Sequence, residues 1–334
     1  MSLTSKSPRR VIAVALAVGR ATLKDYAHPN SPKVFTQPQL FACLSLMVFF
    51  NTDYRGTETL LDDLPALRDW IGLSRVPDHS TLHKAAARLF GSGCSQKLLG
   101  ASLKLILHRR RFVKLAAGDS TGLENRHCSA YFIKRKARGQ TQTSPTSGTP
   151  SENRGKSKGN PLYQTAVYTR YPKLSLLIDC ASHAILTVLT SRGPRPDIQE
   201  LAPLLAELPR GIRLGKLALD AGFDSESNHE LCRAEHGIAS LIPPTHGRPA
   251  KPGRRLTGQW RQTMTHRFKT QARRKQSGYT QRWQIETVNS MIKRNLGPEL
   301  MSRSYQAQNR EMRWMAIVHN IMILLCTGVF DRAG

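Results

Sequence analysis

The sequence predicts an α/β protein in which a mixed β-sheet flanked by helices follows an all-helical N-terminal part. Two observations predict this fold. Through the range Val11–Arg111 the apolar residues recur at helical spacing. From Val113 onward, apolar runs of strand length alternate with helical stretches, which is the order of elements in an α/β sheet. We therefore expect a helical domain over residues 1–112 and an α/β domain over residues 113–334.

The N-terminal domain is predicted to be a bundle of short helices joined by short turns. Thr36 is placed to cap one of them, with Pro38 in its first turn, and either Asp78 or Ser80 is placed to cap another. The expected apolar or helical ranges are 11–23, 36–50, 57–64, 66–72, 81–90 and 95–111. The helices at 57–64 and 81–90 fit a helix-turn-helix and fit an ordinary pair of bundle helices equally well.

Two predicted strands of the second domain each carry one acidic residue in an apolar setting. Val113–Leu123 contains Asp119, and Leu217–Phe223 contains Asp220. A carboxylate in a buried strand costs free energy unless it is hydrogen-bonded or holds a metal ion. The alternative for Asp119 is a residue at the strand end that caps the following turn.

The remaining elements alternate between strand and helix patterns. The expected strands are Gln164–Asp179, Ala184–Leu189 and Ile238–Ile242, and the expected helices are Ile198–Leu208, opened by Asp197, Ser225–Glu235 and Ser304–Phe330. Asp179 reads as a turn former rather than a metal ligand. Asp224, Glu226 and His229 read as solvent-exposed groups.

A late helix over Tyr279–Lys293 has one polar and one aliphatic face. At about 100° per residue, one narrow stripe carries a phenol, two cations and a carboxylate, namely Tyr279, Arg282, Glu286 and Lys293. The opposite side carries Ile285, Val288 and Ile292. The stripe therefore presents Glu286 among groups that bind phosphate. The ordinary alternative is an exposed ion pair between Arg282 and Glu286.

The chain is strongly basic, with 50 Lys and Arg against 23 Asp and Glu and a net charge of +27. Such a charge is costly for a metabolic enzyme, but it favours a polyanionic partner through release of counterions. The basic residues recur along the whole sequence, which indicates a wide nucleic-acid footprint on a folded protein.

Two segments are especially basic. The predicted loop 125–160 is rich in Gly, Ser, Thr and Pro and is expected to touch nucleic-acid backbone through basic residues that include Lys134, Arg135 and Lys136. The second segment is an insertion over 245–278 in which cations are interleaved with Trp260 and Phe268. That pattern suits charge neutralisation combined with base stacking, and a solvated basic loop is the alternative. The DNA contacts expected from this insertion are Trp260, Arg273, Arg274 and Lys275.

The six cysteines show no spacing typical of a zinc site or a disulfide framework. They predict free thiols in a reducing compartment. The apolar run at 40–50 is too short to cross a bilayer. We therefore expect an intracellular, soluble protein without membrane contact.

Three acidic residues stand out together: Asp119, Asp220 and Glu286. Phosphodiester cleavage commonly uses two divalent cations about 4 Å apart. Mg²⁺ binds through carboxylates and keeps several waters, so three acids from two strands and one helix can suffice.

The late helix also resembles the Y-x2-R-x3-E-x6-K signature of bacterial insertion-sequence transposases, the DDE class with a ribonuclease-H-like catalytic core. The matching residues are Tyr279, Arg282, Glu286 and Lys293. GDSTGLE around Asp119 and LALDAGFDSE around Asp220 resemble the two aspartate motifs of that family. The segments 191–197 and 303–324 resemble further family stretches, and the likeness spans roughly residues 35–325.

The resemblance implies a DNA transposase with a ribonuclease-H-like fold, which cleaves at element ends and joins the freed 3′ hydroxyl to target DNA. It implies that Asp119, Asp220 and Glu286 hold two Mg²⁺ ions, with Mn²⁺ able to substitute. It assigns phosphate contacts to Tyr279, Arg282 and Lys293. The implied partners are the terminal inverted repeats and target DNA, bound by a homodimer at the bacterial nucleoid.

The separation of Asp220 and Glu286, 66 residues, is shorter than in family members with a large β-rich insertion domain. In those members the insertion domain contains a tryptophan that assists hairpin formation. Because a full insertion domain is not expected here, that role is not assigned to Trp260. Three rival functions remain open. The first is a structure-selective nuclease or resolvase that cuts without joining, the second a catalytically silent DNA-binding protein, and the third and weakest an RNA-binding protein.

Overall fold

A computed structural model describes residues 6–108, 111–126, 171–245 and 256–324. Most of the predicted loop 125–160, with Lys134, Arg135 and Lys136, lies outside the described residues, as does the beginning of the predicted strand 164–179. The N-terminal part is helical, as expected. Its helices are α1 (Pro8–Thr22), α2 (Gln37–Phe49), α3 (Tyr54–Asp63), α4 (Pro65–Ile71), α5 (His79–Leu89) and α6 (Ser92–Leu107).

Local capping chemistry explains where several of these helices begin. Thr36 and Gln39 form a reciprocal capping box at the start of α2. Asp53 caps α3 by accepting a hydrogen bond of 2.7 Å from the Gly56 amide. Of the two residues that the sequence offered for α5, Asp78 is the cap, because its carboxylate accepts from the Ser80 amide.

The second part is built on a five-stranded mixed sheet in the order β4-β3-β1-β5-β6. Its strands are β1 (Phe112–Gly122), β3 (Tyr171–Asp179), β4 (Ile185–Gly193), β5 (Arg213–Ala218) and β6 (Ala239–Leu241). The pairs β4–β3 and β3–β1 are antiparallel, whereas the pairs β1–β5 and β5–β6 are parallel. This order and direction of strands is ribonuclease-H-like, which confirms the predicted fold class. A small parallel pair, β2 (Glu124–Asn125) and β7 (Glu299–Leu300), was not predicted.

The helices of the second part differ in detail from the prediction. They are η1 (Asp197–Gln199), α8 (Leu201–Ala206), η2 (Ala221–Phe223), α9 (Glu226–Glu230), the π-helical turn η3 (Leu231–Glu235), α10 (Gln259–Arg267), α11 (Gln271–Ser277), η4 (Tyr279–Arg282), α12 (Trp283–Leu296) and α13 (Tyr305–Leu324). Where the sequence suggested a basic loop within 245–278, the described residues form the helices α10 and α11. The predicted helix over 279–293 is divided into the 3₁₀ turn η4 and the helix α12.

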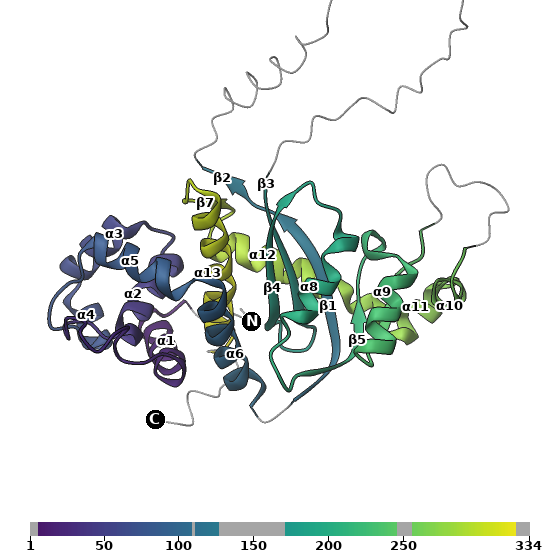
Figure 1. Ribbon diagram of the computed structural model, residues 1–334, viewed down its shortest axis with the longest axis horizontal. Helices are drawn as coiled ribbons and strands as arrows, with labels where there is room; N and C mark the ends of the chain where they lie inside the picture. Colours follow the sequence, from purple (N-terminus) through teal and green to yellow (C-terminus); the bar gives the residue numbers. More distant parts are fainter. Residues whose placement is uncertain (1–5, 109–110, 127–170, 246–255, 325–334) are drawn as a thin grey trace, which may run out of the picture.

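Helices α6 and α13 lie between the N-terminal helices and the sheet (Figure 1). Phe90 of α5 stacks on Trp314 of α13 with ring centroids 4.2 Å apart. Asn320 of α13 donates to Ser102 of α6 and bonds the backbone of Ile185 in β4. One continuous hydrophobic core thus includes residues of both parts. The division into two domains stays a prediction.

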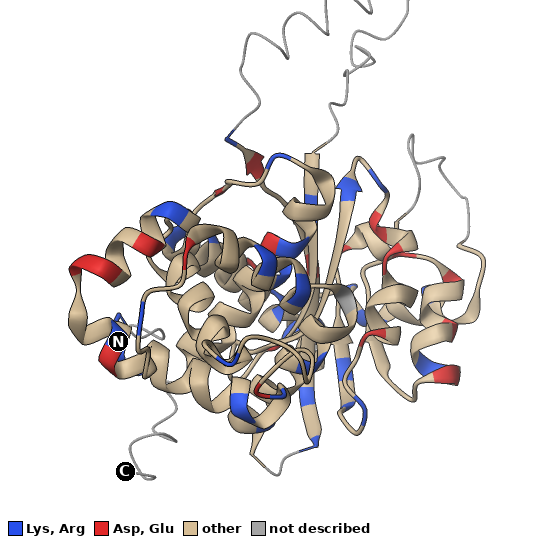
Figure 2. Cartoon of the chain, turned by 60° about the vertical axis from the view of Figure 1, so that its left-hand side comes forward, with Lys and Arg blue, Asp and Glu red and all other residues tan. Residues whose placement is uncertain are grey.

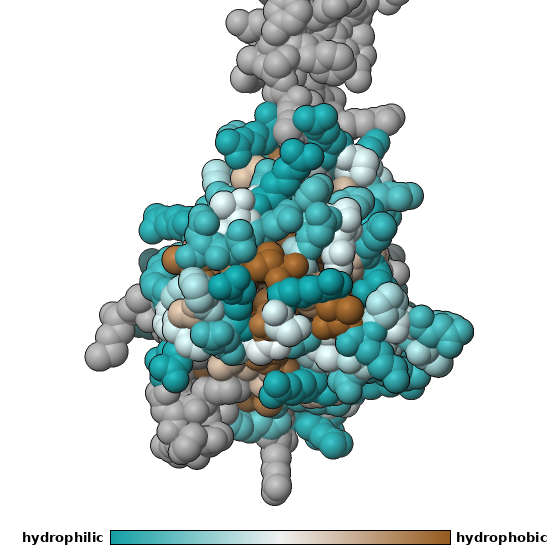
Figure 3. Space-filling model, turned by 90° about the vertical axis from the view of Figure 1, so that its left-hand side faces the viewer, coloured by the Kyte–Doolittle hydropathy of each residue, from teal (hydrophilic) through white to brown (hydrophobic). Residues whose placement is uncertain are grey.

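The surface combines basic and apolar groups. Lys and Arg occur on the N-terminal helices and on the sheet rather than in one segment (Figure 2). The face formed by the N-terminal helices is mainly hydrophilic around a hydrophobic area (Figure 3). The large apolar side chains exposed in this part of the chain are Val34, Phe50, Leu64 and Trp70. Among the residues that the structure describes, no helix is long and apolar enough to cross a membrane.

Candidate active site

Asp119 and Asp220 lie at the same level of two neighbouring parallel strands. The register pairs Ala117 of β1 with Ala218 of β5, and each aspartate follows its alanine by two residues. Asp119 is still in β1, whereas β5 ends at Ala218, so the expectation that Asp220 lies within a strand is wrong. Asp220 instead caps η2, accepting a hydrogen bond of 2.9 Å from the Gly222 amide.

The electrostatics of the two aspartates show that they share one site. Burial raises the pKa of Asp119 to about 6; a hydrogen bond from the Ser120 backbone lowers this pKa, and the negative charge of Asp220 raises it. Burial also raises the pKa of Asp220, followed by the charge of Asp197. The charge of Arg282 lowers both pKa values. Two half-buried carboxyl groups of like charge therefore face the same guanidinium group.

Arg282 connects the aspartates to the polar stripe of the late helix. Its guanidinium donates to Glu286 Oε1 at 2.5 Å, and its side chain is only 22% exposed. Tyr279 and Asp119 also raise the pKa of Arg282, although burial alone would lower it. The opposite side of α12 is buried at Ile285, Val288 and Ile292, which confirms the predicted aliphatic face.

Glu286 does not join the two aspartates in this structure. Its side chain is 59% exposed and bound to Arg282, so the ion pair that the sequence offered as the ordinary alternative is present. Among the described residues, ligand atoms of three acidic, His or Cys side chains come within 4.8 Å of one another only at Glu58, Asp78 and His79. The joint role of Asp119, Asp220 and Glu286 therefore stays a prediction, and in this structure the partner of Glu286 is Arg282.

A family model for the transposase DDE domain matches residues 136–322, which is more than half of the chain. The chain belongs to this family. It is a DNA transposase, an enzyme of the nuclease and transposition class. The matched range includes Asp220 and Glu286 and begins after Asp119.

A solved structure, the crystal structure of a pre-cleavage Mos1 transpososome, aligns with 90% of this chain and 82% of its own at 11% sequence identity, with a TM-score of 0.21. A superposition this loose carries no argument about site geometry. No curated protein matches the sequence.

The basic residues predicted to contact DNA are exposed on α11 in the transposase. Arg273, Arg274 and Lys275 all face solvent. The guanidinium of Arg273 donates to the His266 carbonyl, and that of Arg274 donates to the Phe268 carbonyl. These backbone contacts hold both cations on the surface next to η4.

The two aromatic residues of the 245–278 segment have structural partners. Phe268 is buried and packs edge-on against Tyr279, with ring centroids 4.7 Å apart. The expectation that Phe268 takes part in base stacking is therefore wrong, because the ring belongs to a small core. Trp260 carries the guanidinium of Arg233 over its ring at 4.3 Å. A DNA contact by Trp260 stays a prediction.

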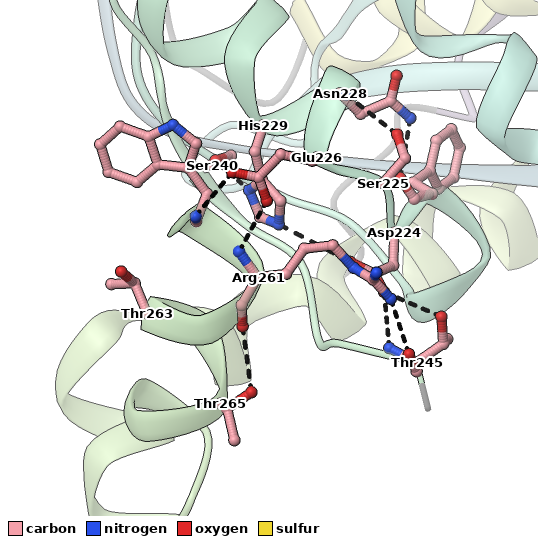
Figure 4. Close-up of polar contacts among 12 residues, drawn as sticks. Asp224, Ser225, Glu226, Asn228, His229, Ser240, Thr245, Arg261, Thr263 and Thr265 are labelled. Carbon is pink, nitrogen blue, oxygen red and sulfur yellow. Dashed lines mark hydrogen bonds and ion pairs between the residues drawn. The ribbon is translucent and has the colours of Figure 1, made fainter. Parts of the chain in front are cut away.

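A buried polar cluster attaches α10 to α9 in the transposase (Figure 4). Arg261 binds the fully buried carboxylate of Asp224 at 2.8 Å, and Thr245 donates to the same carboxylate from its amide and hydroxyl groups. Glu226 accepts from the amides of Trp260 and Arg261 at the start of α10. His229 is fully buried and bonds Ser240. The prediction that Asp224 and His229 are solvent-exposed is wrong, because α10 covers them.

Sequence reasoning missed Asp197, although it quoted the segment that contains this residue. Asp197 was read as a helix opener, yet its charge acts on both Asp119 and Asp220. The sequence does indicate Asp197, because this acid ends the segment SRGPRPD, which resembles a stretch of the family. By contrast, Asp179 is the expected turn former, accepting hydrogen bonds from Ala181 and Ser182.

The donor set around Asp119 and Asp220 fits a hard divalent cation. A Cβ atom added at Gly222 would lie 3.1 Å from Asp220 Oδ1 and 3.3 Å from Asp197 Oδ2, so carboxylate oxygens converge on a space that only glycine leaves open. Carboxylates and water are the ligands that Mg²⁺ and Mn²⁺ prefer. Members of this family generally use divalent metal ions.

Proposed function

We propose that the transposase hydrolyses phosphodiester bonds at the ends of its element and then joins the freed 3′ hydroxyl to target DNA, using Asp119, Asp220 and Glu286 as the carboxylates that hold two Mg²⁺ ions. The observation that carries the proposal is the position of Asp119 in β1 and of Asp220 just after the adjacent strand β5, with the charge of Arg282 acting on both. When bound, the divalent cations activate the attacking oxygen and stabilise the leaving oxygen.

The protein groups around this pair supply positioning. The phenol of Tyr279 is partly buried beside Asp220 and Arg282, whose charges act on its pKa after burial has raised it. Arg282 offers a planar guanidinium suited to bidentate contact with a phosphate. Together they would orient the scissile phosphate against the two aspartates.

Glu286 joins the site, in this proposal, when DNA binds. In this structure Arg282 is paired with the exposed carboxylate of Glu286, and the charge of Asp119 also raises the pKa of Arg282. A DNA phosphate competes with Glu286 for the guanidinium group, because charge-assisted bidentate bonds to phosphate are strong. Once released, Glu286 is free to turn toward the aspartates from the first turn of α12.

The rest of the molecule would hold the DNA. The net charge of +27 supplies affinity through counterion release. We assign backbone contacts to Lys293, to the exposed α11 residues and to Trp260, and also to Lys134, Arg135 and Lys136, which lie outside the described residues. The helical domain of residues 1–112 would read the terminal inverted repeats, and two copies would pair the element ends.

The decisive experiment uses a labelled element end and target DNA. Asp119→Asn and Asp220→Asn should abolish cleavage in Mg²⁺ or Mn²⁺ while DNA binding is kept, and Glu124→Gln, a nearby exposed acid, should cleave normally. Joined 3′ products identify a transposase, whereas cut but unjoined products would favour a nuclease or resolvase. Wild-type protein that binds element ends without cutting them under any of these conditions would favour the catalytically silent alternative.

A further inference from the structure

Lys173 is a buried cation behind the aspartate pair. Its side chain is 5% exposed, although it projects from β3 next to the strand that carries Asp119. The ammonium group contacts Asp197 Oδ1 at 2.6 Å and Glu200 Oε2 at 3.3 Å, and it donates to the Arg195 carbonyl at 2.6 Å. A lysine is rarely buried unless it is paired, and here two carboxylates pair with it.

Glu200 carries this arrangement into the sheet. Its carboxylate is fully buried and accepts hydrogen bonds from Ser175 of β3, from Ser191 of β4 and from Ser120 of β1. Ser120 directly follows Asp119. Ser120, the residue after Asp119, is therefore connected through Glu200 to the ammonium group of Lys173, which also binds Asp197.

Asp197 uses its two oxygens differently. Oδ1 binds Lys173, whereas Oδ2 faces the space above Gly222 that Asp220 Oδ1 also borders. The charge of Asp197 raises the pKa of both Asp119 and Asp220. Asp197 thus stands beside Asp220, across the space above Gly222.

We propose that Asp197 is a further carboxylate of the divalent-cation site and that Lys173 is the residue that positions it. This inference rests on the proposed function, because it extends the site formed by Asp119 and Asp220. It adds a third aspartate to the cation site, although the ligand atoms of the three do not all lie within 4.8 Å of one another in this structure. Since Mg²⁺ and Mn²⁺ retain waters, Asp197 can act through a bound water as well as directly.

The test measures Mn²⁺ binding to the full chain without DNA, by calorimetry and by the electron paramagnetic resonance signal of free Mn²⁺. Asp197→Asn should weaken Mn²⁺ binding by about tenfold to a hundredfold, the usual cost of losing a supporting group of a metal site. Glu124→Gln removes the same charge from an exposed position and should bind as the wild type does.

A second pair of variants separates positioning from folding. Gly222→Ala keeps every charge but fills the space between Asp197 and Asp220, and should weaken Mn²⁺ binding without changing Tm in the absence of metal. Lys173→Met with Glu200→Gln removes the cation together with one of its two acids, so Asp197 loses its anchor. This double variant should fold and bind Mn²⁺ more weakly.

The outcomes distinguish failure of the proposed function from failure of the role proposed for Asp197. If Asp119→Asn and Asp220→Asn leave Mn²⁺ binding unchanged, the metal site of the proposed function is wrong. If those two variants weaken binding while Asp197→Asn and Gly222→Ala do not, the proposed function stands and the role of Asp197 is rejected. Unchanged binding in the folded Lys173 and Glu200 double variant would reject the positioning role of Lys173.

Discussion

Glu286 differs from Asp119 and Asp220 in what surrounds it. The aspartates are half-buried at strand ends, and burial raises both of their pKa values. Glu286 lies on the exposed side of α12 with Arg282 as its partner. A helix residue with one flexible partner can change partners at low cost, whereas a residue fixed in a sheet cannot. In the proposed function, the third acid is the part of the site that responds to DNA.

The variant Glu286→Gln tests this difference at one residue. We expect cleavage of an element end to fall by at least about 10²- to 10³-fold, the range seen when one electrostatic group of an active site is removed. DNA binding should be unchanged or tighter, because Arg282 loses its competing carboxylate. Cleavage rates and equilibrium binding measured on the same DNA check both parts. Weaker DNA binding by a folded variant would show that Glu286 supports the fold of α12 rather than restraining Arg282.

The sequence singled out the acids that we propose as catalytic, but not the buried groups Lys173 and Glu200. Asp119 and Asp220 are visible because each follows an apolar run, and this local pattern survives in the fold. Lys173, Asp197 and Glu200 contact one another across β3, η1 and α8, and residue spacing carries no signal for such contacts. A buried lysine in a strand also cannot be distinguished in the sequence from an exposed one.

At the scale of elements, capping and turn residues predicted where some helices and strands begin or end. Contacts between distant segments determined the elements that were not predicted. The cap at Thr36 and the turn at Asp179 follow from neighbouring residues and were predicted. The helices α10 and α11 were not predicted, because their composition is polar and basic with little apolar periodicity. They are held by contacts to distant segments, namely Arg261 to Asp224 and Phe268 to Tyr279.

The docking of α10 can be tested through its buried ion pair. Arg261→Met leaves the buried carboxylate of Asp224 without its cation and should lower the free energy of unfolding by about 3–5 kcal/mol. Adding Asp224→Asn removes the uncompensated charge, so the double variant should be more stable than Arg261→Met alone. Urea unfolding of the two variants and the wild type measures the difference. Thr263→Ala, an exposed change on the same helix, serves as the control, and equal losses in the single and double variants would contradict an ion-pair origin.

At the scale of the whole molecule, α13 joins the two parts of the chain through buried polar as well as apolar contacts. His319 of α13 is 1% exposed and bonds the His183 carbonyl at 3.0 Å, and Asn320 links α6 to β4. The packing of α13 against α6, α1 and α2 ties the N-terminal helices to the sheet.

Buried histidines in this arrangement make stability depend on pH. Burial lowers the pKa of His319, and likewise that of His229, from 6.5 to about 4. Between these values the unfolded chain binds protons that the folded chain does not, so stability is fully present above about pH 6.5 and is lost as the pH falls toward 4. Each histidine contributes a slope of about 1.4 kcal/mol per pH unit in this window. Protonation of Asp119, whose pKa is raised to about 6, opposes the loss in part.

The variant His319→Gln isolates one of these contributions, because glutamine keeps a donor for the His183 carbonyl but does not titrate. The wild type should lose about 1.4 kcal/mol more per pH unit than the variant between pH 6.5 and pH 4. Urea unfolding across this range measures the two slopes, and the contribution of Asp119 cancels because both proteins carry it. Equal slopes would mean that His319 is protonated in the folded state, which the burial of α13 between the two parts of the chain opposes.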